Sequence, residues 1–177
     1  SKTVIEHDSY AMMDERGLTA HPFFRKLGGF SINLTNYKEM IRSLKYAISL
    51  LQKGKSIWLF PQGQEEHLEK RPLQFKTGAS YLLMKSKNTL FVPVTYYYSF
   101  GHEQYPSVYI SIGKSWTTKN FQQLDRKTLT HKLEEIVTNQ LDKQRHDIIT
   151  SETNHYKVLL AGRRTIGKRH ELPRKRA

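Results

Sequence analysis

Apolar residues recur every three or four positions between residues 37 and 52, which is the clearest pattern along the chain. This spacing is typical of a helix with one apolar face, so we predict a helix over Tyr37–Gln52. Thr35 or Asn36 could cap its start, and Gly54 would end it. The apolar face would consist of Tyr37, Met40, Ile41, Leu44, Ile48 and Leu51.

Short apolar runs bounded by turn residues predict strands on both sides of this helix. Two of them, Ser56–Phe60 and Leu90–Tyr97, are apolar almost throughout, so we expect both strands to be buried. The complete set of expected strands is Ser9–Met13, Phe30–Leu34, Ser56–Phe60, Leu90–Tyr97 and Val108–Ile112.

Further helices are expected over Gln74–Ser86 and roughly 126–144, with a loop or a short helix within 17–29. Because strands and helices alternate, the pattern favours an α/β fold: a mostly parallel central sheet flanked by helices. A chain of 177 residues suits one domain, which we place at residues 1–150.

The charge of the chain is strongly positive and uneven. Lys and Arg number 29 against 16 Asp and Glu, a net charge of +13. Residues 163–177 carry seven cations and one glutamate, so we interpret 151–177 as a basic C-terminal tail. Such a surface favours an anionic partner, namely lipid headgroups, nucleic acid or a phosphorylated substrate.

Several classes of site are excluded by composition. The chain has no cysteine, which excludes a disulfide scaffold, a cysteine zinc site and a thiol nucleophile. No stretch approaches 18 consecutive apolar residues, so no membrane-spanning segment is expected. The eight histidines lack any recognised metal-ligand spacing, so no metal site is assigned.

The residues that are candidates for ligand binding lie between residues 56 and 78. The strand at Ser56 ends in Phe60-Pro61-Gln62-Gly63, and after a polar loop Phe75-Lys76-Thr77-Gly78 opens the next helix. Ligands of open α/β sheets bind beyond the carboxyl ends of strands, and free N–H groups at a helix start beside a lysine attract anions. A Pro-x-Gly sequence after a strand is also a common turn, so this stretch alone leaves both readings open.

Four blocks in the same order resemble those of the lysophospholipid acyltransferase family, the 1-acylglycerol-3-phosphate acyltransferases. Phe60–Gly63 is similar to its Phe-Pro-Glu-Gly block, Phe75–Gly78 to its Phe-Lys-x-Gly block, and Val92-Pro93-Val94 to its Val-Pro-Val strand. Gly28–Leu34 loosely resembles its Gly-x-Phe-x-Ile-x-Arg block. The resemblance covers roughly residues 10–115.

This resemblance implies a glycerolipid acyltransferase-like fold that transfers a fatty acyl group to a lipid hydroxyl, such as that of a lysophospholipid or glycolipid. Acyl-CoA or acyl carrier protein would be the cosubstrate, with no metal and no bound cofactor. The implied partners are this donor, the lipid acceptor and an anionic membrane surface, with the protein cytoplasmic and peripheral at the inner membrane face. The substrate-binding residues would be Phe60, Pro61, Gln62, Gly63, Lys76 and Gly78.

The family's catalytic His-x4-Asp pair is missing. None of the eight histidines has an aspartate five positions later, so we assign no catalytic residue. Relative to that family the chain is either N-terminally incomplete or a degenerate member, and we expect the chain alone to be inactive. A non-catalytic lipid-binding relative is therefore the alternative function.

Two further departures concern the acceptor. Leu34 stands where the family commonly has an arginine, and Gln62 to Glu66 replaces its Glu-Gly-Thr-Arg-Ser. Because guanidinium groups grip phosphate, the acceptor is expected to be a less anionic lipid, for example a glycosylated lipid or a carotenoid. Lys26, Arg71 and Lys76 could still supply a phosphate grip.

A nucleic-acid-binding module is a third reading, based on the net charge and the ten tyrosines. It is disfavoured, because no recognised nucleic-acid-binding motif is present and the tyrosines do not alternate with basic residues.

Overall fold

The computed structural model describes residues 8–101 and 105–160, and the chain divides into two compact units. The first unit contains the residues up to Val92 together with Ser115–Glu135, and the second contains Pro93–Lys114 and the residues from Ile136 onwards. Residues 161–177 of the expected basic tail lie outside the described residues.

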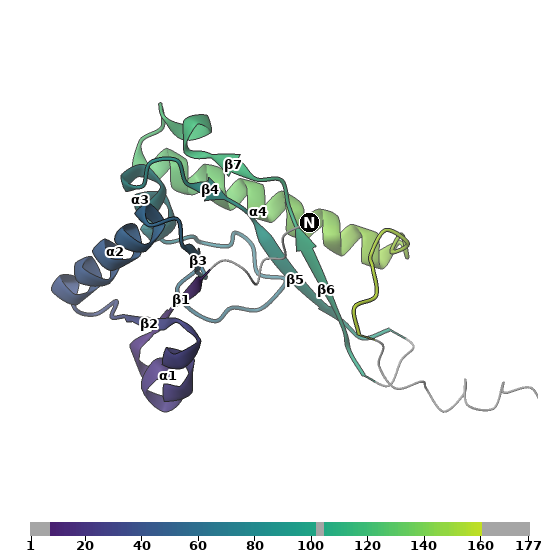
Figure 1. Cartoon of the computed structure of the whole chain (residues 1–177). Coiled ribbons are helices and arrows are strands. Elements are labelled where there is room, and N and C mark those ends of the chain that lie inside the picture. The colour runs from purple at the N-terminus through teal and green to yellow at the C-terminus, as the bar shows by residue number, and fades with distance from the viewer. Residues whose placement is uncertain (1–7, 102–104, 161–177) are drawn as a thin grey trace, which may run out of the picture. The chain divides into compact units, whose positions relative to one another are not determined.

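A small parallel sheet organises the first unit (Figure 1). It contains β1 (Ser9–Asp14), β2 (Gly29–Ile32) and β3 (Ser56–Trp58), in the order β2-β1-β3. β1 is parallel to both neighbours, with Ala11 opposite Gly29 and Ser9 opposite Ser56. Parallel strands need crossover connections, and helices supply them here.

The first crossover consists of α1 (Glu15–Ala20) and the 3₁₀ helix η2 (Pro22–Leu27), and the second is α2 (Tyr37–Gln52). The prediction for α2 is confirmed at both ends. Asn36 is its cap, since the side-chain oxygen accepts the N–H groups of Lys38 at 3.1 Å and Glu39 at 3.3 Å.

The apolar face of α2 builds the core of the first unit. Leu44 and Ala47 are buried together with Leu82 of α3 (Gly78–Lys85). The remaining side chains packed on this cluster come from the three strands, from the residue after β3 and from the two helices: Met12, Phe30, Ile32, Met40, Ile41, Ile48, Leu51, Ile57, Leu59 and Tyr81. Burial of this apolar surface is the main stabilisation of the unit.

Antiparallel pairs replace part of the expected parallel sheet. The run Leu90–Tyr97 is broken into β4 (Leu90–Phe91) and β5 (Val94–Ser99), with Pro93 between them. β4 pairs antiparallel with β7 (Trp116–Thr117), and β5 pairs antiparallel with β6 (Ser107–Ile112). The single buried strand expected there was therefore wrong, because Pro93 cannot donate to a strand ladder. The fold is mixed α/β with a three-stranded parallel sheet.

Two other expectations differ from the structure. The strand at Ser56 ends at Trp58, and it is not fully buried: Trp58 is 42% exposed and Phe60 75% exposed. β3 lies at an edge of the described sheet, so only one of its sides is paired. The helix expected from Gln74 begins at Gly78, because Gln74 has a positive φ of 58° and its N–H is bound elsewhere.

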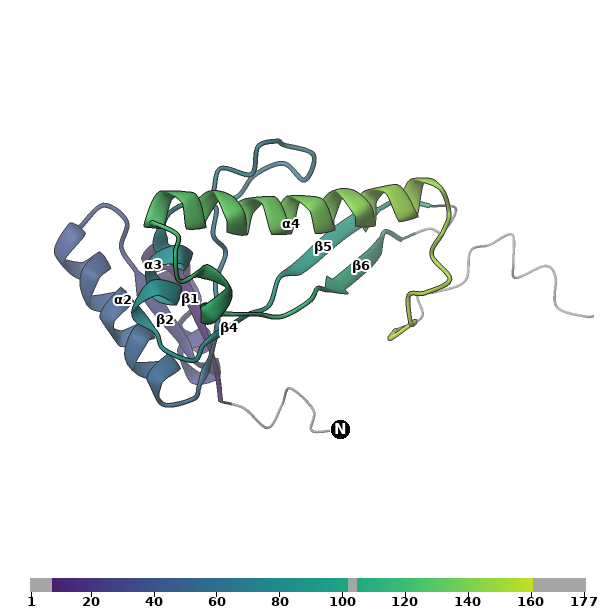
Figure 2. The same cartoon turned by 90° about the horizontal axis from the view of Figure 1, so that it is seen from above.

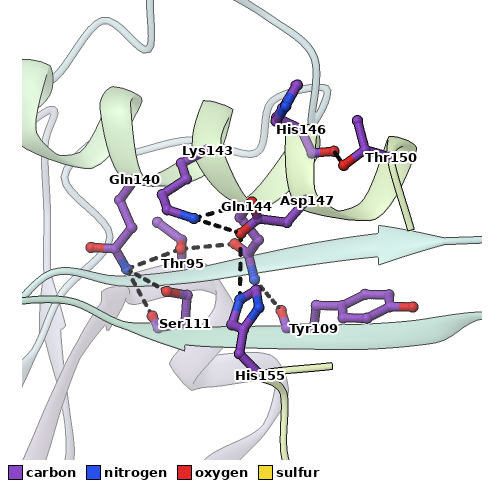
Figure 3. Close-up of polar contacts among 10 residues, drawn as sticks. All are labelled: Thr95, Tyr109, Ser111, Gln140, Lys143, Gln144, His146, Asp147, Thr150 and His155. Carbon is purple, nitrogen blue, oxygen red and sulfur yellow. Dashed lines mark hydrogen bonds and ion pairs between the residues drawn. The ribbon is translucent and has the colours of Figure 1, made fainter. Parts of the chain in front are cut away.

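In the second unit, the β5–β6 hairpin runs alongside the later part of α4 (Arg126–Ile149), as Figures 1 and 2 both show. Hydrogen bonds join them (Figure 3). Gln140 Nε2 donates to the Ser111 carbonyl at 2.8 Å, while Gln144 accepts from the Thr95 hydroxyl at 2.9 Å and donates to the Tyr109 carbonyl at 3.0 Å. The opposite face of the hairpin carries exposed apolar side chains: Tyr96, Tyr98, Val108, Ile110 and Ile112.

Candidate functional site

The residues that follow the strands of the parallel sheet at its carboxyl end are polar after β1 and include apolar ones after β2 and β3. Glu15 comes directly after β1, Asn33 and Leu34 after β2, and Phe60 shortly after β3. Parallel strands end at the same edge of their sheet, and this edge is where α/β sheets bind ligands.

Gly63 is the point at which three segments meet. Its φ of +70° lies in the left-handed region, and a Cβ at this position would stand 3.3 Å from Lys76 Cγ and 3.6 Å from Leu34 Cδ1. The Lys76 N–H donates to the Pro61 carbonyl at 2.7 Å, which ties the two segments together. The blocks at 60–63 and 75–78 thus lie side by side, with the end of the Gly28–Leu34 block beside them.

The exposed side chains at this point include both apolar and cationic ones. Phe60 is 75% exposed and Leu34 is 48% exposed. Lys76 is also exposed, while Gln62 and Gly78 are half-buried. Exposed apolar side chains beside a lysine suit an amphiphile with an anionic group.

The backbone N–H groups before α3 are not free for a ligand. Those of Gln74 and Phe75 donate to the two carboxylate oxygens of Glu134 on α4, at 2.9 and 3.1 Å. With the Lys76 N–H bound to Pro61, the expected anion site made by N–H groups beside Lys76 has lost three of its donors to protein acceptors. The Lys76 side chain remains as the cationic group of this segment.

An ion pair and a hydrogen bond to Glu66 hold the loop between Gly63 and Pro72. Lys70 Nζ lies 2.6 Å from Glu66 Oε1, and Gln64 Nε2 donates to the same oxygen. The hydrogen bonds from Lys70 and Gln64, with smaller contributions from the positive charges of Lys70 and Lys76, lower the pKa of the Glu66 carboxyl. Glu66 therefore stays ionised near Lys76.

Arg71, which the sequence offered as a phosphate grip, is used within the same loop. Its guanidinium donates to the carbonyls of Leu68 at 3.0 Å and Lys70 at 2.8 Å. The carbonyl groups of the loop thus accept guanidinium N–H groups that would otherwise be available to bind a phosphate.

Asn33 is a connecting residue that the sequence did not single out. Its Nδ2 donates to Glu15 Oε2 at 2.7 Å and to Glu39 Oε2 at 3.0 Å, and its Oδ1 accepts the N–H of Thr35. Its position directly after a strand was the available signal. The contact links the ends of β1 and β2 to the start of α2.

One aspartate–histidine pair does occur, in the second unit. His155 Nε2 lies 3.4 Å from Asp147 Oδ2, and Lys143 Nζ lies 2.9 Å from the same oxygen (Figure 3). The hydrogen bond and the negative charge of Asp147 raise the pKa of Lys143. Because Lys143 already neutralises the carboxylate, we interpret the group as an ionic contact at the end of α4.

Two negative findings hold for the residues that the structure describes. No group of three or more His, Asp or Glu side chains among them could hold a metal ion. Within the same residues, no helix combines the length and the apolar character needed to cross a membrane.

Comparison with known proteins matches the region that contains the converging segments. The family model described as Acyltransferase matches residues 7–97, just over half of the chain, including β1 to β4, α1 to α3 and the site around Gly63. No curated protein and no solved structure matches the chain significantly. The matched region covers the parallel sheet together with Leu34, Gly63 and Lys76, and on this basis the chain belongs to the acyltransferase family.

Proposed function

We propose that this acyltransferase domain transfers a fatty acyl group from acyl-CoA or acyl carrier protein to a lipid hydroxyl, as in the lysophospholipid acyltransferases. The observation that carries the proposal is the meeting of Leu34, Gly63 and Lys76 at the carboxyl edge of the sheet. This meeting lies inside the region matched by the family model.

Each residue of the site has a part in this proposal. Lys76 steadies an anionic group of the donor or acceptor, and Gly63 lets the substrate approach the backbone. Gln62 hydrogen-bonds the acceptor, while the exposed Phe60 and Leu34 contact hydrocarbon. Pro61 and Gly78 shape the two segments.

The chemical class of the proposed acceptor lipid is inferred from the charges around Gly63. The neighbour of Gly63 on the β2 side is the aliphatic Leu34, and Glu66 in the adjoining loop is ionised. A phosphate beside Gly63 would meet Lys76 on one side but no guanidinium from Arg71, which is bound to its own loop. The proposed acceptor is therefore a lipid with little negative charge, for example a glycosylated lipid or a carotenoid.

The second candidate function is non-catalytic lipid binding. One observation favours it: no histidine in the 177 residues stands five positions before an aspartate. Loss of a general base alone typically slows a reaction by about 10²–10⁴-fold. Such a relative would still present the apolar and cationic surface around Gly63.

An anionic membrane is the proposed location of either activity, at the cytoplasmic face. The net charge of +13 supports it, since each Lys or Arg near an anionic bilayer contributes about 1 kcal/mol of attraction. Cosedimentation with anionic but not with zwitterionic vesicles, reversed by salt, would support this location. Equal binding to both vesicle types would contradict it.

The test begins with the intact mass of the protein isolated from its own cells, compared with 20.8 kDa. That protein is then supplied with labelled acyl-CoA or acyl carrier protein and with either lysophosphatidate or a neutral glycolipid. Acylated glycolipid formed faster than acylated lysophosphatidate supports both the reaction and the acceptor. Faster acylation of lysophosphatidate overturns the proposed acceptor, and lipid binding without any product favours the non-catalytic function.

Substitutions of two lysines, one in the site and one outside it, test whether donor binding depends on the proposed site. Lys76→Ala should lower donor binding by about tenfold, the worth of one charge-assisted contact. Lys85→Ala removes the same charge from the last turn of α3 and should change nothing. Equal effects of the two substitutions would remove Lys76 from the proposed site.

A further inference from the structure

A hollow lies in the first unit beside β2, which is an edge strand among the described residues. It has a volume of about 300 Å³ and lies between η2, β2 and α2. Arg25 comes from the end of η2, Phe30 and Ser31 from β2, and Arg42 and Tyr46 from α2. The cluster around Gly63 contributes none of these residues.

The wall of this hollow carries two arginines. Both side chains are exposed, and the structure records no ion pair or side-chain hydrogen bond for either guanidinium with any described residue. Two guanidinium groups on the wall of one hollow give it a positive potential, which attracts an anion. Guanidinium groups bind phosphate in a bidentate fashion, which a single lysine cannot do.

The same hollow has an aromatic wall. The rings of Phe30 and Tyr46 are 5.2 Å apart at an interplanar angle of 80°, and Tyr46 is 45% exposed. The edge-to-face contact fixes the Tyr46 ring, so its free surface is available for a flat group. Ser31 also lines the hollow, and its hydroxyl group is a possible donor to a ligand.

Carboxylates limit where an anion can lie. Glu15 and Glu39 line a smaller hollow of about 200 Å³, which shares Ser31 and Arg42 with the first. Both carboxylates accept from Asn33 Nδ2, at 2.7 and 3.0 Å. An anion is therefore favoured on the Arg25 side of Arg42, away from these two charges.

We propose that the hollow between Arg25 and Arg42 binds a phosphate monoester. Phosphate binding in this separate hollow does not depend on acyl transfer, whereas its assignment to coenzyme A as the acyl donor rests on the proposed function. The phosphate could belong to the 3′-phosphoadenosine part of coenzyme A or to the phosphate of a glycerol-phosphate head group. Tyr46 favours the nucleotide, because a base can stack on its ring.

The hollow and the site at Gly63 are close enough to serve one ligand. Ser31 lies in the hollow, and Leu34, which faces Gly63, follows it by three residues. Three residues of chain span at most about 11 Å. A phosphorylated donor anchored between the arginines would thus reach the carboxyl edge of the sheet.

The experiment measures binding to the full chain by titration calorimetry at low salt. The probes are coenzyme A, 3′-dephospho-coenzyme A, glycerol 3-phosphate and inorganic phosphate. We expect at least one phosphate monoester to bind more tightly than about 1 mM, with an affinity that falls as salt rises. Preference for coenzyme A over its dephospho form identifies the nucleotide source, and preference for glycerol 3-phosphate identifies the head group.

Substitutions place that binding in the hollow. Arg25→Gln and Arg42→Gln should each weaken it by about tenfold or more, and Arg42→Lys, which keeps the charge but loses the bidentate contact, by less. Arg126→Gln at the start of α4 removes an equivalent exposed charge and should leave it unchanged. Unfolding midpoints equal to that of the unsubstituted chain show that the variants are folded.

The proposal is overturned if no phosphate monoester binds, or if binding survives both arginine substitutions. Neither result bears on acyl transfer, since no readout here depends on product formation. Conversely, a chain without acyltransferase activity would still bind phosphate at this hollow.

Discussion

The Glu134 carboxylate accepts the backbone N–H of Phe75 at 3.1 Å, although the two residues are 59 positions apart in the chain. The neighbouring N–H of Gln74 donates to the other carboxylate oxygen. One side chain of α4 thus holds the segment that leads to Lys76. The position of Lys76 beside Gly63 depends on this contact, because no regular secondary structure includes residues 74–76.

Replacing Glu134 should therefore release this segment. Glu134→Ala leaves two backbone donors without their carboxylate, which should lower the free energy of unfolding by about 1–3 kcal/mol. It should also weaken donor binding at Lys76. The matched control is Glu135→Ala, which removes only a surface pair with Lys132 and should cost at most about 0.5 kcal/mol. Urea unfolding of both variants measures the difference, and equal losses would argue against the role of Glu134.

Gly63 and Gly54 have the same backbone conformation but different surroundings. Substituting each in turn therefore measures the cost of backbone strain apart from the effect of a close neighbouring side chain. Gly63 and Gly54 have φ values of +70° and +73°, but a Cβ on Gly54 would meet nothing within 4 Å. Both alanine substitutions should cost about 1–2 kcal/mol for the left-handed conformation. Gly63→Ala should in addition push against Lys76 and impair substrate binding. If Gly54→Ala impaired binding equally, the close approach at Gly63 would not matter.

Gln144 should be a main determinant of packing in the second unit. It is 1% exposed and joins the Thr95 hydroxyl to the Tyr109 carbonyl. Gln144→Ala should leave the buried Thr95 hydroxyl without its acceptor and the Tyr109 carbonyl without this donor, at a cost of about 1–3 kcal/mol. The exposed Asn139→Ala on the same helix is the control. Hydrogen exchange at the amides of β5 and β6 should accelerate only in the first variant, and unchanged exchange there would contradict this prediction.

The start of α4 should lose stability in acid. Asp125 accepts the N–H and hydroxyl of Thr128 and the N–H of Lys127, and these hydrogen bonds lower the pKa of its carboxyl. A lowered folded-state pKa adds stability above the ordinary carboxyl pKa, and this stability disappears as the pH falls through the lowered value. The advantage of the unsubstituted chain over Asp125→Ala should thus shrink in acid. Thermal unfolding from neutral to acidic pH tests this, and an advantage that grows as the pH falls would refute it.

Local patterns predicted much of the first unit. The spacing of apolar residues predicted α2 at both ends, and short apolar runs predicted β1, β2 and the start of β3. The acyltransferase resemblance also rested on local blocks, and the family model confirms the family for residues 7–97. The lysophospholipid subtype, the substrates and the substrate-binding roles remain predictions.

Other features depend on partners far away in the chain, so local patterns could not show them. The helix expected from Gln74 begins four residues later because a carboxylate on α4 binds the intervening backbone. The Thr95 side chain of β5 binds Gln140 and Gln144, so the apolar side chains that alternate with it in the hairpin lie on the exposed face.

The sequence by itself determined the helix with the strongest periodicity, the strands around it and the family, because each depends on residues close together along the chain. Only the tertiary structure decided that Leu34, Gly63 and Lys76 meet, that Arg71 is bound by its own loop, and that Arg25 and Arg42 share one hollow. The physical reason is that hydrogen bonds and side-chain packing act between atoms that folding brings together, whatever their separation in the sequence.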